Sequence, residues 1–152
     1  MHWIRLSPGL IFATAAAMKT RILIVENHKA WQRKLRSLLE KIPDFEVVGV
    51  AEDGLSAIQM ADSCHPHVML TDITLPGING LETIRRVHTT MPNILAVIVT
   101  LHTDSSFVHK ALEVGAKGYV VKDHVLNELE PSIRSALQDM IYISAHVQDD
   151  NS

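Results

Sequence analysis

Five polar residues stand at points in the sequence where an apolar run ends. One apolar run ends at Thr71, and the carboxylate of Asp72 and a Pro-Gly turn at 76–77 follow it directly. Three other apolar runs end in the same way, at Glu26-Asn27, at Thr100 and at Lys122. The carboxyl ends of parallel strands meet at one edge of a sheet. If these runs are such strands, two carboxylates, an amide, a hydroxyl and an ammonium group meet in one pocket.

This set of groups favours phosphoryl chemistry. Neighbouring carboxylates repel each other unless a positive charge offsets the repulsion, and a hard divalent cation with oxygen ligands does so. Lys122 adds a fixed positive charge, and the Thr100 hydroxyl can hydrogen-bond to an oxyanion. The groups therefore fit an anion such as a phosphoryl group, with a carboxylate as nucleophile. Each residue alone is more often a turn former, a helix cap or a solvated side chain, so the inference rests on their joint placement.

The elements that must position these residues alternate along the chain from Arg21 onward. The strands are predicted from continuous apolar runs, which are typical of parallel strands covered on both faces, at 21–25, 45–51, 67–71, 94–100 and 117–121. Asp53 and Asn79 are predicted to cap the second and third helices, and the fourth helix is expected to start near Asp104. The last helix is expected over about 127–140, and Pro131 is expected to kink it or to restrict its regular part to residues after Glu128. Five βα units in a row predict an α/β fold with a doubly wound, five-stranded parallel sheet.

Length and composition set limits on the function. The chain has 152 residues, of which 47% are hydrophobic and 20% charged, and this suits one globular domain. The formal net charge of -3 and the absence of a Lys/Arg run give no indication of nucleic-acid binding. The single cysteine, Cys64, excludes an internal disulfide and fits a reducing compartment. Residues 1–18 are interpreted as an N-terminal extension of uncertain role, with a targeting or anchoring segment as the alternative, and the rest of the chain has no segment that could cross a membrane.

From Lys19 to about Ser144 the sequence resembles the receiver domain of two-component response regulators. The resemblance rests on ILIVENH after the first strand, on LTDITLPGINGLE around Asp72, on Thr100, and on GYVVKD with Tyr119 and Lys122. It implies a flavodoxin-like (βα)5 fold with strand order 2-1-3-4-5, a receiver domain over 19–141, and a tail or the start of a linker over 142–152. The stretch IRSALQDMIYIS is similar to the subgroup whose receivers precede a helix-turn-helix DNA-binding domain.

The resemblance also implies roles for single residues. Asp72 would accept a phosphoryl group from a sensor histidine kinase or a phosphotransfer protein, with Thr100 and Lys122 as its catalytic partners. Mg²⁺ would be held by Glu26, Asn27, Asp72 and the backbone carbonyl of Thr74. Thr100 would then turn toward the phosphoryl group, and Tyr119 would follow inward and alter the face formed by the fourth helix, fifth strand and fifth helix. The protein would be cytoplasmic, would act on no substrate other than its own Asp72, and would not itself bind nucleic acid or a membrane; a homodimer is left open.

Asn27 departs from the family pattern, because most members have an acidic metal ligand there. Its amide can coordinate Mg²⁺ without adding charge, so weaker metal binding is expected, although the longer Glu26 side chain could ligate directly. The alternative function is therefore an atypical receiver that acts as a phosphorylation-independent interaction module. An aspartyl-phosphate phosphatase is disfavoured because Thr74 replaces the second aspartate of such enzymes, and a dinucleotide binder is disfavoured because no G-x-G-x-x-G follows the first strand.

Overall fold

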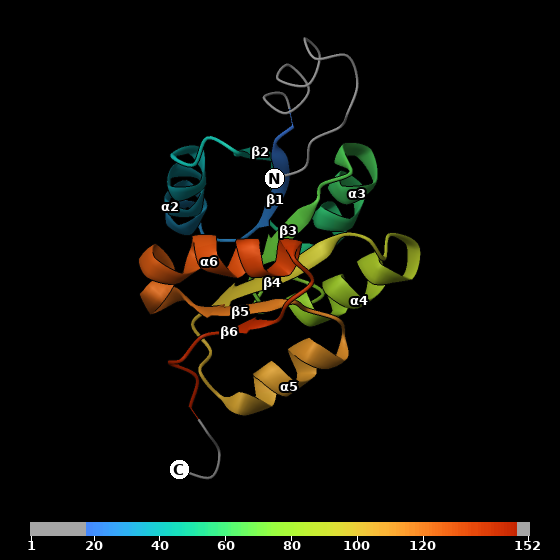
Figure 1. Cartoon of the computed structure of the whole chain (residues 1–152). Helices are drawn as coiled ribbons and strands as arrows, with labels where there is room; N and C mark the ends of the chain where they lie inside the picture. Colours follow the sequence, from blue (N-terminus) through green and yellow to red (C-terminus); the bar gives the residue numbers. More distant parts are fainter. Residues whose placement is uncertain (1–17, 149–152) are drawn as a thin grey trace.

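A parallel sheet of six strands forms the centre of the molecule (Figure 1). The structure is a computed structural model that describes residues 18–148. The strands are β1 Thr20–Val25, β2 Phe45–Ala51, β3 Val68–Thr71, β4 Leu95–Thr100, β5 Gly118–Val121 and β6 Tyr142–Ile143. The α-helices of this region are α2 Lys29–Glu40, α3 Gly54–Cys64, α4 Gly80–Thr90, α5 Ser105–Glu113 and α6 Val125–Leu137, and a 3₁₀ turn, η1 Lys122–His124, leads into α6.

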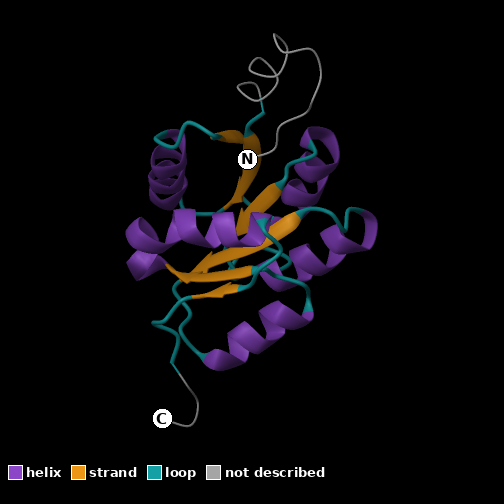
Figure 2. Cartoon of the chain, viewed as in Figure 1, coloured by secondary structure: helices purple, strands orange, loops and turns teal. Residues whose placement is uncertain are grey.

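The sheet has the order β2-β1-β3-β4-β5-β6, which confirms the predicted order 2-1-3-4-5 and extends it by one strand. The helices lie on both faces of the sheet, and loops join them to the strands (Figure 2). Two clusters of buried side chains fill the space between the sheet and the helices, one on each face. One joins the sheet to α2 and α6 and includes Leu39 and Ile133, and the other joins it to α3, α4 and α5 and includes Ile84 and Val108. The doubly wound α/β prediction is therefore confirmed.

The strands are continuous apolar runs because both of their faces are covered. Every residue of β3 and β5 is buried, and Ile22–Val25 of β1 are at most 1% exposed. Strand order reverses direction at β1, which lies between β2 and β3. A crevice for ligands is expected outside the carboxyl ends of the strands at such a reversal. Glu26 follows β1 and Asp72 follows β3, so both carboxylates lie at this position.

The predicted helix starts depend on local capping. The Asp53 side chain accepts a hydrogen bond of 2.8 Å from the Ser56 amide, and the Asn79 side chain accepts one of 2.8 Å from the Glu82 amide. Both caps confirm the prediction. The prediction for the last helix, about 127–140, was wrong at both ends, because α6 runs from Val125 to Leu137. It is also helical on both sides of Pro131, so its regular part does not begin only at Glu128. Asn127 and Pro131 are exposed, so water can satisfy the Asn127 carbonyl that loses its helical partner.

The chain after α6 adds an edge strand that was not predicted. Residues 142–143 pair in parallel with Gly118 and Tyr119 of β5, and the Ser144 amide donates to the Tyr119 carbonyl at 2.8 Å. Further on, Gln148 bridges to Asp104 at the start of α5. The segment interpreted as a tail or linker therefore starts with residues that belong to the sheet. The interpretation of residues 1–17 lies outside the described residues. Between residues 18 and 148, no helix has the length and apolar character needed to span a bilayer.

Candidate functional site

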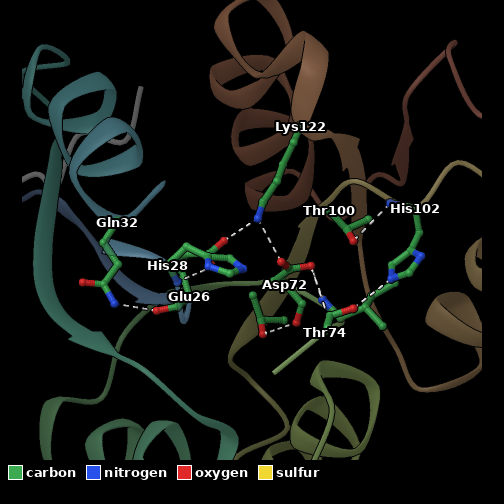
Figure 3. Close-up of polar contacts among 10 residues, drawn as sticks. Glu26, His28, Gln32, Asp72, Thr74, Thr100, His102 and Lys122 are labelled. Carbon is green, nitrogen blue, oxygen red and sulfur yellow. Dashed lines mark hydrogen bonds and ion pairs between the residues drawn. The ribbon is translucent and has the colours of Figure 1, made fainter. Parts of the chain in front are cut away.

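Lys122 joins the two carboxylates at the strand ends (Figure 3). Its Nζ atom lies 2.6 Å from Glu26 Oε1 and 2.9 Å from Asp72 Oδ2. The Glu26 and Lys122 side chains are each 1% exposed, and that of Asp72 is 8% exposed. Lys122 is the partner of the buried Oε1 atom, which accepts no other hydrogen bond within the described chain. The Trp31 ring covers the ammonium group, with its centroid 4.8 Å from Nζ.

The sheet register brings these side chains together. Val25 pairs with Thr71, and Thr100 pairs with Val121, so the residues that follow each strand emerge at the same edge. The Asp72 amide donates to the Val25 carbonyl at 3.1 Å, which extends the ladder between β1 and β3 by one residue. The predicted convergence of Glu26, Asp72, Thr100 and Lys122 at one edge of the sheet is therefore observed.

Backbone amides orient both carboxylates. Asp72 Oδ1 accepts hydrogen bonds from the amides of Ile73 at 2.7 Å and Thr74 at 3.4 Å, while Oδ2 faces Lys122. Glu26 Oε2 accepts from the His28 amide at 2.9 Å. Donors on both oxygens thus fix the Asp72 carboxylate. Of the three charged side chains, Glu26, Asp72 and Lys122, that of Asp72 is the most exposed.

His102 connects the Asp72 loop to the region around Tyr119. Its Nε2 atom lies 2.8 Å from Thr74 Oγ1, its amide donates to Thr100 Oγ1 at 3.4 Å, and its carbonyl accepts from the Tyr119 hydroxyl at 2.9 Å. His102 was not among the residues that the sequence pattern singled out. Its position two residues after Thr100 was the available signal, but its contacts come from three separate segments of the chain.

Tyr119 occupies an inward position. It is 1% exposed, and burial together with the charges of Asp104 and Asp72 raises the pKa of its hydroxyl above the ordinary value. The His102 carbonyl satisfies the Tyr119 hydroxyl in this position. The predicted movement of Tyr119 on phosphorylation stays a prediction.

The oxygen atoms at this edge can hold a hard divalent cation. Glu26 and Asp72 contribute two carboxylates against the one ammonium group of Lys122, which contacts both. The Thr74 carbonyl accepts no backbone hydrogen bond within the described chain. Carboxylate and carbonyl oxygens are the ligands that Mg²⁺ prefers, so the donors fit this ion. Asn27 is exposed in the bend between β1 and α2 and adds a neutral amide beside them.

Comparison with known proteins gives consistent matches. The family model described as the response regulator receiver domain matches residues 22–134. The transcriptional regulatory protein DegU of Brevibacillus brevis is 31% identical over 129 residues, which cover 85% of this chain and 55% of DegU. The response regulator GacA of Pseudomonas protegens is 35% identical over 127 residues, which cover 84% of this chain and 60% of GacA. The chain thus spans a little over half the length of these relatives.

Two solved structures extend the similarity to the fold. A two-component response regulator of the LuxR family from Aurantimonas sp. SI85-9A1 has a TM-score of 0.82 and 32% identity, covering 85% of this chain and 92% of that one. The response regulator domain of CheB from Thermotoga maritima has a TM-score of 0.75 and 29% identity, covering 79% of this chain and 97% of that one.

Proposed function

The chain belongs to the response regulator receiver domain family, and on that basis we propose that Asp72 accepts a phosphoryl group from a sensor histidine kinase or a phosphotransfer protein. The observation that carries the proposal is the Asp72 carboxylate itself. It directly follows the C-terminal end of β3, accepts hydrogen bonds from two backbone amides and is paired with Lys122. A carboxylate fixed in this way can attack phosphorus without first being reoriented.

The transfer exchanges one bond to phosphorus for another. An Asp72 oxygen forms a bond to phosphorus as the bond to the donor's histidine nitrogen breaks, and the imidazole leaves with its electron pair. Charge spreads over the phosphoryl oxygens in the transition state, and Lys122 offers a fixed positive charge to them. Bound Mg²⁺ would add to this neutralisation, held by Glu26, Asp72, the Thr74 carbonyl and Asn27. Because Asn27 is neutral, we expect weaker metal binding than with a third carboxylate.

We propose that the signal leaves the site through Thr100 and His102. The Thr100 hydroxyl is buried and accepts only a long hydrogen bond of 3.4 Å from the His102 amide. It is therefore available to donate to a phosphoryl oxygen. A shift of His102 would alter the hydrogen bond to the Tyr119 hydroxyl and, through it, the face formed by α5, β5 and α6. The relatives are full-length regulators, so we infer that this face controls an output domain or partner in transcription regulation.

The test is phosphorylation by a small donor. The protein is incubated with phosphoramidate or acetyl phosphate and Mg²⁺, and its intact mass is measured before and after hydroxylamine treatment, which cleaves acyl phosphates. We expect one hydroxylamine-sensitive phosphoryl group on the wild-type protein and on Asp123→Asn, an exposed control next to Lys122. Asp72→Asn should gain none. Equal incorporation by Asp72→Asn would show that another residue is the acceptor.

A phosphorylation-independent interaction module is the second candidate. It is favoured by Asn27, whose neutral side chain stands where most of the family has an acidic metal ligand. The same experiment separates the two candidates, since this second function predicts no mass gain even at saturating Mg²⁺.

A further inference from the structure

His124, Glu128 and His146 form a cluster that joins η1, α6 and the segment after β6. One potential ligand atom from each residue lies within 4.8 Å of the other two. The two imidazole rings are stacked, with centroids 3.3 Å apart and planes 10° apart, and His146 Nε2 lies 3.9 Å from Glu128 Oε2. None of these residues takes part in the phosphoryl site described above.

Glu128 is a buried acidic residue at the centre of this cluster. The residue is 7% exposed, and within the described chain no Lys or Arg side chain forms an ion pair with it. Its Oε1 accepts from the Tyr142 hydroxyl at 2.8 Å and its Oε2 from the Ser144 hydroxyl at 3.0 Å. Both donors are neutral, and the pKa of Tyr142 is raised to about 12 by burial and by Glu128, so this hydroxyl stays protonated near neutral pH. A buried carboxylate whose hydrogen-bond donors are both neutral is a favourable ligand for a metal cation.

The cation that fits best is a transition-metal ion. An imidazole nitrogen without a proton donates its lone pair to such an ion, and one nitrogen of each ring lies within 4.8 Å of a Glu128 oxygen. Two imidazoles and one carboxylate form a ligand set typical of zinc, whereas Mg²⁺ prefers oxygen ligands alone. The hydroxyls of Tyr142 and Ser144 act on the carboxylate as outer partners that fix a metal ligand.

We propose that His124, Glu128 and His146 bind Zn²⁺ or a similar divalent transition-metal ion, with water completing the coordination. Metal bonds of about 2.0–2.2 Å require the ligand atoms to approach one another more closely than they do here. The His146 ring must also turn out of its stack on His124, because the nitrogen lone pairs lie in the ring planes, which are nearly parallel here. His146 can make this movement because its side chain is half exposed and lies at the edge of the fold.

Metal binding at this cluster would tie down the segment that leads away from the receiver. His146 lies between β6 and Gln148, whose amide donates to the Thr103 carbonyl at 2.7 Å and whose carbonyl accepts from the Ser105 amide at 3.1 Å. The metal would therefore link the start of α6 to residues that contact the start of α5. These two helices flank β5 in the proposed output face. Metal binding would therefore reduce the local opening of residues 142–148 at the edge of that face.

The test is a zinc titration of the full chain by calorimetry, with melting temperature and amide hydrogen exchange as second readouts. We expect one strong site per chain, a higher melting temperature with zinc, and slower exchange over residues 142–148. His146→Gln should weaken binding about tenfold or more and remove both zinc effects. This variant is expected to fold because the side chain is exposed and donates no hydrogen bond in the structure.

Two control variants locate the site. His109→Gln changes an exposed histidine of α5 outside the cluster and should bind zinc like the wild type. Asp72→Asn should also keep the affinity, since it alters only the phosphoryl site. The proposal is overturned if zinc produces no heat or melting shift, if His146→Gln binds as tightly as the wild type, or if Asp72→Asn removes the binding.

Discussion

Lys122 and Glu26 form a buried ion pair, with 2.6 Å between Nζ and Oε1 and both side chains 1% exposed. The same ammonium group also contacts Asp72, so two carboxylates share one lysine. The site therefore carries one more negative than positive charge. This arrangement orients the Asp72 carboxylate, and a divalent cation can offset the excess of negative charge.

Without the Lys122 ammonium group, the carboxylates of Glu26 and Asp72 should repel each other and destabilise the fold. We expect Lys122→Met, which nearly preserves the volume, to lower the free energy of unfolding by about 3–5 kcal/mol, because it leaves buried charges without their partner. Millimolar Mg²⁺ should restore part of the loss. Chemical denaturation with and without Mg²⁺ measures both effects. Lys117→Met is the control, since Lys117 pairs with the mostly exposed Asp139 and should change stability by less than about 1 kcal/mol. Equal losses in both variants would contradict the assigned role of Lys122.

Gly80 allows α4 to start against the backbone of Asp72. A Cβ atom at position 80 would lie 1.9 Å from the Asp72 carbonyl oxygen, and this oxygen belongs to rigid backbone. Gly80→Ala should therefore displace the acceptor loop, lower stability by about 1–3 kcal/mol and slow phosphorylation from a small donor. Gly49→Ala serves as the control, because its nearest neighbour would be a flexible Leu23 side-chain end at 3.3 Å. Unchanged melting temperature and phosphorylation in Gly80→Ala would show that the loop can accommodate a methyl group.

The fold could be predicted largely because burial on both faces gives the strands continuous apolar runs. Asp53 and Asn79 marked helix starts because their caps depend on neighbouring residues only. By contrast, β6 has two residues, too few for any periodicity, and pairs only because Tyr142 and Ile143 lie beside β5. The role of His102 and the burial of Glu128 depend on contacts between segments distant in sequence, which local patterns do not encode.

The two tyrosines of the chain should ionise only at unusually high pH. Burial raises the pKa of Tyr119, and burial with Glu128 raises that of Tyr142 to about 12. A raised pKa means that folding favours the neutral phenol. The associated stability is fully present below the unfolded value of about 10 and is lost as pH rises through the folded value. Tyrosinate absorbance during alkaline titration checks this, with Tyr142→Phe to isolate Tyr119. Ionisation of both residues near pH 10 in the folded protein would contradict the buried positions.

Thr100→Ala separates phosphorylation from the response to it. Asp72 and Lys122 remain intact in this variant, so we expect it to accept phosphate from a small donor. The NMR shifts of the His102 amide and the Tyr119 ring should change on phosphorylation of the wild type and much less in the variant, because the connecting hydroxyl is absent. Thr89→Ala, an exposed control on α4, should respond like the wild type. Identical spectral changes in Thr100→Ala would place the signal route elsewhere.

Asn27 can be tested because its surroundings isolate the effect of charge. The residue is exposed next to the buried Glu26, and conversion to aspartate nearly preserves its shape. Without metal, a third carboxylate adds repulsion to a site that already carries excess negative charge, so the melting temperature of Asn27→Asp should fall. With Mg²⁺ the same charge attracts the ion. The difference in melting temperature between Asn27→Asp and the wild type should then become smaller or change sign.

We expect Asn27→Asp to bind Mg²⁺ about tenfold more tightly, which corresponds to about 1.4 kcal/mol. Trp31 provides the readout, because its ring centroid lies 4.8 Å from Lys122 Nζ and the fluorescence should respond when the ammonium group moves. The titration is made in a Trp3→Phe background, so that Trp31 is the one tryptophan that contributes fluorescence. Asn93→Asp adds the same charge at an exposed loop and should leave the affinity unchanged. Equal or weaker Mg²⁺ binding by Asn27→Asp would mean that position 27 does not face the metal and that Glu26 and Asp72 hold it without that residue.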